Sequence, residues 1–397
     1  MNEIIKSFSD FAWGLPLVFL LIGGGLYLLV LSKFLPFRFL GHAIQVLRGK
    51  YDNEDDSGEI SHFKALTTAL SSTIGMGNIA GVAVAISVGG PGAMFWMWIS
   101  AIAGMSTKFF TCSLSVMYRG KDSAGDIQGG PMYFIMEGLG KSWKPLAVMF
   151  SVFGMIGALP VVNVNQLTQA INDIVLIPNG VEVGLKSNLI LAFVLVTLTS
   201  VIILGGLKRI STAASKMVPS MVILYFVLVL FILISNYELV PRYFLMIFTD
   251  AFSAENYNGD SFYGGVLGAL ILLGIRRGAF SNEAGIGTAP MAHGAAKTNE
   301  PIREGLVAML GPAIDTLVVC TLTALAILVT DVWETTSDNG VSLTASAFSH
   351  TMPVYGKYLL MVCVAIFSVS SLFSYSYYGT KCLSFLIGAD RKHYYNY

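Results

Sequence analysis

Three glycines and an asparagine interrupt an apolar segment that is long enough to cross a lipid bilayer. The stretch reads Thr73-Ile-Gly-Met-Gly-Asn-Ile-Ala-Gly81. A helix in lipid pairs its backbone groups internally, because lipid offers no hydrogen-bonding partner. Glycine weakens that pairing more than any residue except proline. We therefore expect the helix to break here and to expose N–H and C=O groups to a small solute or ion.

Such a break would expose both N–H groups, which attract anions, and oxygen atoms, which attract cations. The N–H groups of Gly75 and Gly77 would begin the second half of the helix, where the helix dipole favours an anion such as a carboxylate. The carbonyls near Ile74 and the side-chain oxygens of Thr73 and Asn78 suit a small hard cation. Close helix packing through small residues is the alternative for the glycines. The asparagine among them favours a binding site.

A second apolar segment carries glycines together with ionisable and amide residues. Ionisable groups at membrane depth usually pair or face a cavity, so pairing of Arg276 or Arg277 with Glu283 and contact with a ligand both stay open. Ser281 and Asn282 are better candidates for ligand or ion contact, because they are neutral donors and acceptors. Two broken helices separated by intact ones are typical of inverted-repeat transporters with a site near the midplane. The segment reads Gly274-Ile-Arg-Arg-Gly-Ala-Phe-Ser-Asn-Glu-Ala-Gly-Ile-Gly287.

Amide side chains gather in a further apolar segment, directly after Pro160. They are Gln169 and the amides of the run Asn163-Val-Asn-Gln166. A single amide in a membrane helix usually bonds to a neighbouring helix. Several amides after a proline kink favour the wall of a cavity.

Serine hydroxyls occur in the last apolar segment, in the run Ser368-Val-Ser-Ser371, with Tyr375 one helical turn later. Such hydroxyls can bond to the carbonyls of their own helix. Alternatively, two of them complete a sodium shell, because Na⁺ is a hard cation that prefers oxygen. Both interpretations stay open.

The composition is that of a membrane protein. Hydrophobic residues make up 54% of the 397 positions and charged residues 12%, against roughly 25% charged residues in soluble domains. Apolar segments of bilayer-crossing length recur along the chain, so we expect an all-α polytopic protein in a lipid bilayer. The formal net charge is zero, which argues against nucleic acid as a partner.

We predict nine spans joined by short connections within a single transmembrane domain over 1–397. The first is expected to be a spanning helix, because no signal-peptide cleavage motif follows it. The predicted spans are 14–33, 63–87, 92–117, 145–171, 188–205, 216–236, 261–280, 304–330 and 356–380.

The basic residues predict the orientation. With the N-terminus outside, Lys6, Lys186, Arg242 and Lys357 fall in outer segments, and Lys108 falls within the third span. The others among the 24 Lys and Arg fall in or near inner loops, with Arg276 and Arg277 beside the fourth of these. This asymmetry follows the positive-inside rule and places residue 397 on the cytoplasmic side of the plasma (inner) membrane. We expect Lys108 to snorkel to the inner interface.

No enzyme site competes with these binding-site candidates. The four cysteines lie in or at the ends of apolar segments without a CxxC motif, so we expect them to be free and buried. The histidines form no metal-binding or nucleophile motif. They are His42, His62, His293, His350 and His393.

Several long strings resemble the alanine/glycine:cation symporter family, also called sodium:alanine symporters. The resemblance runs from the first span to Lys381, nearly the whole chain. Besides 73–85 and 277–287, the strings are Phe63-Lys-Ala-Leu-Thr-Thr-Ala-Leu, Gly89-Gly-Pro-Gly-Ala-Met-Phe-Trp-Met-Trp98, Asp315-Thr-Leu-Val-Val-Cys-Thr321 and Tyr377-Tyr-Gly379.

The resemblance implies a LeuT-type inverted-repeat fold. An extra helix at 14–33 would precede a first five-helix repeat over 63–236 and a partial second repeat over 261–380. It also implies symport of sodium with small neutral amino acids, chiefly alanine and glycine, by alternating access. The family usually has eleven spans, so nine predicted spans leave the second repeat without its last two helices.

The family's binding residues transfer by position. The implied substrate contacts are Gly75, Gly77, Asn78, Asn163, Phe280, Ser281, Asn282 and Tyr375. The implied sodium contacts are Thr73, Ile74, Asn78, Ser370 and Ser371.

Four positions depart from the family pattern. Asn163 stands where the family usually has glutamine, and Tyr375 where it has tryptophan, so the expected pocket wall differs. Thr111 and Thr380 replace acidic residues, which removes two charges.

Two alternatives stay open at this point. The absent helices favour a membrane sensor that binds an amino acid, or a fragment that no longer transports. Coupling to protons rather than sodium would need Lys108 or Glu283 as the titrating group. The sequence predicts no oligomeric state.

Overall fold

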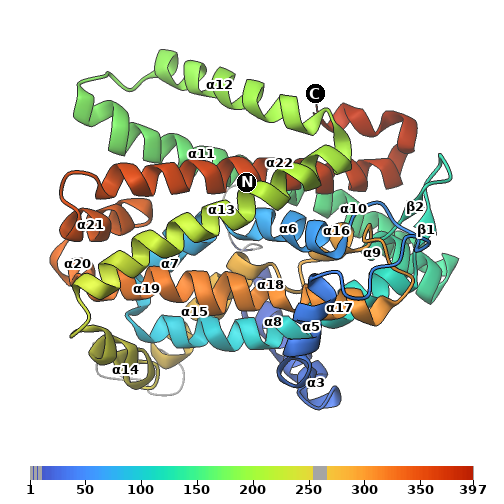
Figure 1. Cartoon of the computed structure of the whole chain (residues 1–397), viewed down its shortest axis with the longest axis horizontal. Helices are drawn as coiled ribbons and strands as arrows, with labels where there is room; N and C mark the ends of the chain where they lie inside the picture. The colour runs from blue at the N-terminus through green and yellow to red at the C-terminus, as the bar shows by residue number, and fades with distance from the viewer. Residues whose placement is uncertain (1–2, 4–6, 8–10, 254–265, 397) are drawn as a thin grey trace.

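The computed structural model describes residues 3, 7, 11–253 and 266–396, which form a bundle of long helices (Figure 1). Among these residues the one sheet is a short antiparallel pair, β1 (Gly120–Lys121) and β2 (Ile127–Gln128). The all-α class predicted from composition is confirmed.

Six continuous segments of the described residues are long and apolar enough to cross a membrane. They are Gly92–Met117 (α8), Lys141–Asn179 (η4, α10, α11, η5 and η6), Leu185–Ile203 (α12), Gly206–Ser235 (α13), Pro301–Leu328 (α17, α18, η7 and α19) and Gly356–Ile387 (α22). A seventh span is a bent pair, in which His62–Thr73 (α6) meets Gly77–Gly89 (η2 and α7) at 54°. These seven coincide with seven of the nine predicted spans.

The other two predicted spans fall on shorter helices. The first corresponds to Pro16–Leu31, made of α2 (Leu15–Val18), η1 (Phe19–Gly23) and α3 (Gly24–Leu31). The second, predicted over 261–280, corresponds to α15 (Val266–Asn282), and residues 261–265 lie outside the described part of the chain. Nine spans therefore stay a prediction.

Two long helices organise the packing. Helix α8 packs against α3, α15 and α17, and α22 packs against α6, α10 and α13. The pair α11 and α12 lies along one edge of the molecule (Figure 1). The remaining bounds are α4 (Leu35–Arg38), α5 (Leu40–Leu47), α9 (Pro131–Phe134), η3 (Ile135–Leu139), η4 (Lys141–Trp143), α10 (Lys144–Gly157), α11 (Val161–Ile171), η5 (Asn172–Leu176), η6 (Ile177–Asn179), α14 (Val240–Asp250), α16 (Ala289–His293), α17 (Pro301–Ala308), α18 (Leu310–Pro312), η7 (Ala313–Cys320), α19 (Thr321–Leu328), α20 (Val332–Thr335), α21 (Val341–Thr351) and η8 (Ala389–Asn396).

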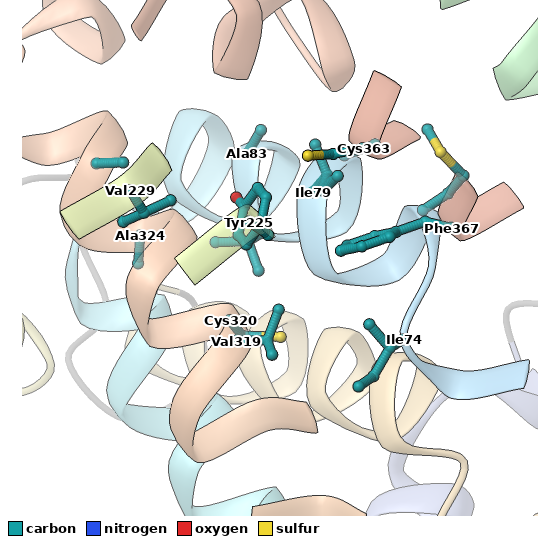
Figure 2. Close-up of a cluster of buried hydrophobic side chains, with 14 of the residues drawn as sticks. Ile74, Ile79, Ala83, Tyr225, Val229, Val319, Cys320, Ala324, Cys363 and Phe367 are labelled. Atoms are coloured by element: carbon teal, nitrogen blue, oxygen red, sulfur yellow. The ribbon is translucent and has the colours of Figure 1, made fainter. Parts of the chain in front are cut away.

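An apolar core surrounds the bend between α6 and α7. Ile74 and Ile79, on the two sides of the bend, are fully buried with Tyr225 of α13 and Phe367 of α22 (Figure 2). The Tyr225 hydroxyl is paired with Thr323 Oγ1 at 2.7 Å, so this polar group costs little inside the core.

Segments predicted to be cytoplasmic gather at the end of the bundle that carries β1, β2 and α9, and α14, α20 and α21 lie at the opposite end (Figure 1). Half-buried Arg119 joins three of these segments. Its guanidinium donates to the carbonyls of Ser57, Gly294, Ala296 and Thr298. One planar group with several N–H donors thereby ties together backbone carbonyls of segments that are distant in sequence.

The structure contradicts the prediction that Lys108 snorkels to the interface. Its side chain is 2% exposed, and a Cβ placed on Gly311 would lie 3.3 Å from its Nζ. Helix α8 continues to Met117, which is about 13 Å further along the axis, too far for the side chain to reach the helix end. Glu283 and Asp315 are the carboxylates that attract its charge.

We expect Arg119→Lys to lower the free energy of unfolding by about 1–3 kcal/mol, because one ammonium cannot reach all four carbonyls on the two neighbouring segments. Thermal unfolding of the purified protein in detergent measures this loss. The matched control is Arg48→Lys at an exposed position, with an expected change within about 0.5 kcal/mol. Equal stability of the two variants would contradict the role of Arg119.

Candidate functional site

The first predicted break is present, and Asn78 closes it. Helix α6 ends at Thr73, and Ile74 is extended with ψ 96°. Asn78 is fully buried, and its Oδ1 accepts the Gly75 N–H at 2.9 Å. A side-chain carbonyl therefore replaces the backbone partner that the broken helix removes.

The second break lies after Asn282, within the predicted segment 274–287 and beyond Gly274 and Gly278. Helix α15 continues through both glycines, and the backbone then turns with positive φ at Glu283 (53°) and Gly285 (87°). Asn282 Oδ1 accepts the Ala284 N–H at 3.0 Å. Each break is thus closed by an asparagine.

The glycines within α15 serve close packing instead. A Cβ on Gly274 would lie 2.6 Å from the carbonyl oxygen of Ala93, and one on Gly278 would lie 2.8 Å from Ser100 Cβ. Both neighbours belong to α8. The glycines let α15 approach α8 without interrupting its own hydrogen bonds.

The two broken helices touch at their breaks. A Cβ on Gly77 would lie 3.3 Å from Ser281 Cα and 3.6 Å from Phe280 Cδ1. On the other side, a Cβ on Gly75 would lie 2.9 Å from Ser371 Oγ. The structure thus brings together predicted site residues from three segments that are distant in sequence.

Asp315 is hydrogen-bonded to residues at both breaks. From the sequence it was not identified as a site residue. It lies on η7 and is fully buried. Its Oδ1 accepts from Asn78 Nδ2 at 2.7 Å, and its Oδ2 accepts from Ser281 Oγ at 2.8 Å and Thr316 Oγ1 at 2.7 Å. A carboxylate in the membrane interior is costly unless it is hydrogen-bonded and charge-balanced.

Neighbouring residues of η7 extend this junction. Asn282 Nδ2 donates to Thr316 Oγ1 at 3.2 Å, and the sulfur of Cys320 lies 3.3 Å from Asn78 Nδ2 and 3.2 Å from Ser281 Oγ. The four cysteines, Cys112, Cys320, Cys363 and Cys382, are free and buried as predicted. The π-helical segment η7 therefore forms a third wall of the site.

Glu283 is paired with hydroxyls rather than with an arginine. It accepts from Tyr375 and Thr288 and from Ser72 at 3.3 Å. Among the described residues, the ion pairs include none between Glu283 and Arg276 or Arg277. Tyr375 is thus linked to the second break by its hydrogen bond to Glu283.

The serines of α22 bond to a carbonyl of their own helix, which is one of the two arrangements that the sequence left open. Ser370 Oγ and Ser371 Oγ donate to the Phe367 carbonyl at 2.9 and 3.0 Å. A hydroxyl that donates one bond keeps its lone pairs for accepting. Both oxygens are buried, and Ser371 faces the break at Gly75, so binding to a cation remains compatible with this geometry.

Some of the amide side chains of α11 line a cavity and others do not. Gln166 and Gln169 line a cavity of about 350 Å³ that also reaches Met76 and Phe280 beside the two breaks. Asn163 is half-buried and is not among the residues that line this cavity. The predicted cavity wall is therefore formed by the later part of the amide run.

Comparison of the sequence with known proteins identifies a matching family of transporters. A sequence model described as the sodium:alanine symporter family matches residues 1–397. The chain belongs to the sodium:alanine symporter family. Proteins of this family are transporters and not enzymes, and the chain is accordingly a membrane protein.

Three relatives whose names state a substrate match the chain over nearly its whole length. The chain is 40% identical over 391 residues to the sodium/alanine symporter AgcS of Methanococcus maripaludis, which covers 97% of this chain and 84% of that protein. It is 35% identical over 392 residues to the probable sodium/glutamine symporter GlnT of Bacillus subtilis, covering 97% and 78%. A third relative is the putative sodium/proton-dependent alanine carrier protein YrbD of B. subtilis, which is 34% identical over 403 residues, covering 97% and 79%.

We expect Gly77→Ala to destabilise the fold by about 1–3 kcal/mol, because the added methyl meets the Ser281 backbone. The matched control is Gly81→Ala in the same segment, where a Cβ meets nothing within 4 Å. That control is expected to be neutral or to gain up to about 1 kcal/mol. Thermal unfolding of both variants measures the difference in stability. Equal changes in the free energy of unfolding would contradict contact between the two breaks.

Proposed function

We propose that this chain carries a small neutral amino acid together with sodium across the plasma membrane by alternating access. The observation that supports this most directly is the junction of Asn78, Ser281 and Asp315, where two broken helices face each other. Inverted-repeat transporters bind their solutes at such breaks near the membrane midplane. The proposal includes a LeuT-type fold with the extra helix at 14–33, repeats over 63–236 and 261–380, and the N-terminus outside.

The substrate's two charges have separate partners in this proposal. The carboxylate would bind the N–H groups of Gly75 and Gly77, where the second half of the broken helix begins with η2. The buried carboxylate of Asp315 supplies negative charge for the ammonium group or for the accompanying cation. Phe280, Ser281 and Asn282 would face the substrate from the other broken helix.

The proposed sodium ligands are neutral oxygens. They are the carbonyls of Thr73 and Ile74, the side-chain oxygen of Asn78, and the hydroxyls of Ser370 and Ser371. Sodium adds one positive charge to a neutral zwitterion, so a membrane potential contributes about 2.3 kcal/mol per ion per 100 mV. That energy can concentrate the amino acid inside the cell.

A second candidate function is proton coupling. Lys108, Glu283 and Asp315 are among the buried ionisable side chains of the described residues, and buried ionisable groups in membranes often relay protons. Replacing sodium with potassium at constant pH separates the two functions. Uptake that continues unchanged in potassium would exclude sodium coupling.

We expect Asn78→Ala to abolish sodium-dependent uptake of labelled alanine into proteoliposomes, because it removes a proposed sodium ligand and uncaps the break. The control is Asn188→Ala at an exposed position on α12, which is expected to transport normally. Near-normal transport by Asn78→Ala would remove Asn78 from the site.

We expect Asn163→Gln to change the preference among alanine, glycine and larger amino acids without changing the sodium dependence. The longer amide can extend along α11 towards the cavity that Gln166 already lines. Uptake competition among labelled and unlabelled amino acids measures the preference. An unchanged profile would place Asn163 outside the pocket.

A further inference from the structure

The cavity beside the two breaks has walls of opposite charge. On one wall, Gln166, Gln169 and Asp173 project from a single face of α11 and η5, at helical spacings of three and four residues. On another wall, α15 contributes Arg277 and Phe280. The cavity of about 350 Å³ is large enough for a small ligand.

Arg277 was expected beside an inner loop, and the structure places it elsewhere. The cavity that it lines is also lined by Asn339 and Gly340, in the turn before α21. That turn lies in the segment 331–355, which the basic-residue pattern predicts to be outside. Because α15 continues to Asn282 before it breaks, Arg277 faces the cavity rather than the cytoplasmic loops.

The Arg277 guanidinium has no carboxylate partner within the described residues, where the ion pairs within 4.0 Å involve only histidines. It is half-buried, and Asp173 is exposed towards solvent. A guanidinium in an apolar helix is costly without an anion, and it binds carboxylates with two parallel hydrogen bonds. The two opposite charges that line this cavity therefore complement a zwitterion, which carries both a positive and a negative charge.

We propose that this cavity is a second binding site for zwitterionic α-amino acids, which stages the substrate before it reaches the breaks. Arg277 binds the carboxylate, Asp173 binds the ammonium group, and the amides of Gln166 and Gln169 offer further hydrogen bonds to these two groups. Phe280 lies between this cavity and Gly77, so a substrate that leaves the site passes directly to the junction. The inference rests on the proposed function for its role in transport.

The test uses the full chain in lipid nanodiscs in potassium buffer without sodium, where the proposed central site lacks its cation. Saturation-transfer NMR with L-alanine is expected to show binding in the wild type. Arg277→Gln and Asp173→Asn should each weaken it by about tenfold, the loss expected for one charge-assisted contact. The exposed control Glu182→Gln should bind like the wild type.

The ligand series tests the class of molecule. Propionate, which lacks the ammonium group, should bind about tenfold more weakly than alanine. Equal binding of propionate would overturn recognition of a zwitterion. Arg277→Lys retains the positive charge but loses the two parallel hydrogen bonds, so it should bind alanine more tightly than Arg277→Gln and more weakly than the wild type. If Arg277→Gln does not fold, Asp173→Asn at its exposed position still decides.

Uptake into proteoliposomes tests the staging role. Asp173→Asn should raise the KM for alanine by about tenfold and keep the maximal rate within about twofold, because the junction is intact. Unchanged KM together with unchanged sodium-free binding would overturn the inference. Sodium-free binding that needs both charges, in a protein that shows no uptake, would support the site and overturn the proposed transport function.

Discussion

The need to satisfy backbone groups at two interrupted helices governs this structure. Lipid cannot replace the lost hydrogen bonds, so each break needs a partner inside the protein. Asn78 and Asn282 supply a side-chain carbonyl to the chain beside their own break. Their amide groups then donate to Asp315 and Thr316 on η7. One π-helical segment therefore fixes the relative position of both breaks. A buried polar network of this kind specifies the fold only if all its donors and acceptors are satisfied.

The surroundings of this junction explain why it persists in a membrane. Apolar side chains such as Ile74, Ile79 and Phe367 enclose the first bend, so water has little access from that side. Glu283 holds the second bend to α22 through Tyr375 and to α6 through Ser72. The backbone at Glu283 is left-handed, a conformation that costs energy for a residue with a side chain. Three hydroxyl partners offset that cost.

The sequence predicted the features that local chemistry controls. Glycines next to Asn78 indicated the first break, and hydropathy placed seven spans where long apolar segments are found. Features that depend on tertiary packing were not predictable. Gly274 and Gly278 pack against α8 instead of breaking α15, which only the neighbouring helix reveals. The burial of Lys108 was missed because nearby carboxylates come from distant segments. Asp315 was within reach of sequence reasoning, since an acid in an apolar span is by default a functional candidate.

The dual use of Asn78 offers a physical basis for coupling under the proposed function. Its Oδ1 accepts the Gly75 N–H in this structure, and the proposed substrate carboxylate needs that same N–H. A carboxylate that takes the N–H leaves the Asn78 oxygen with an unused lone pair in a buried site, where an unmet acceptor is costly. Sodium satisfies this oxygen and also balances the added negative charge. Each ligand therefore improves the site for the other, and linkage requires that the benefit be reciprocal. The coupling would then originate in a single shared side chain, and Asp315 would act by holding its amide in place.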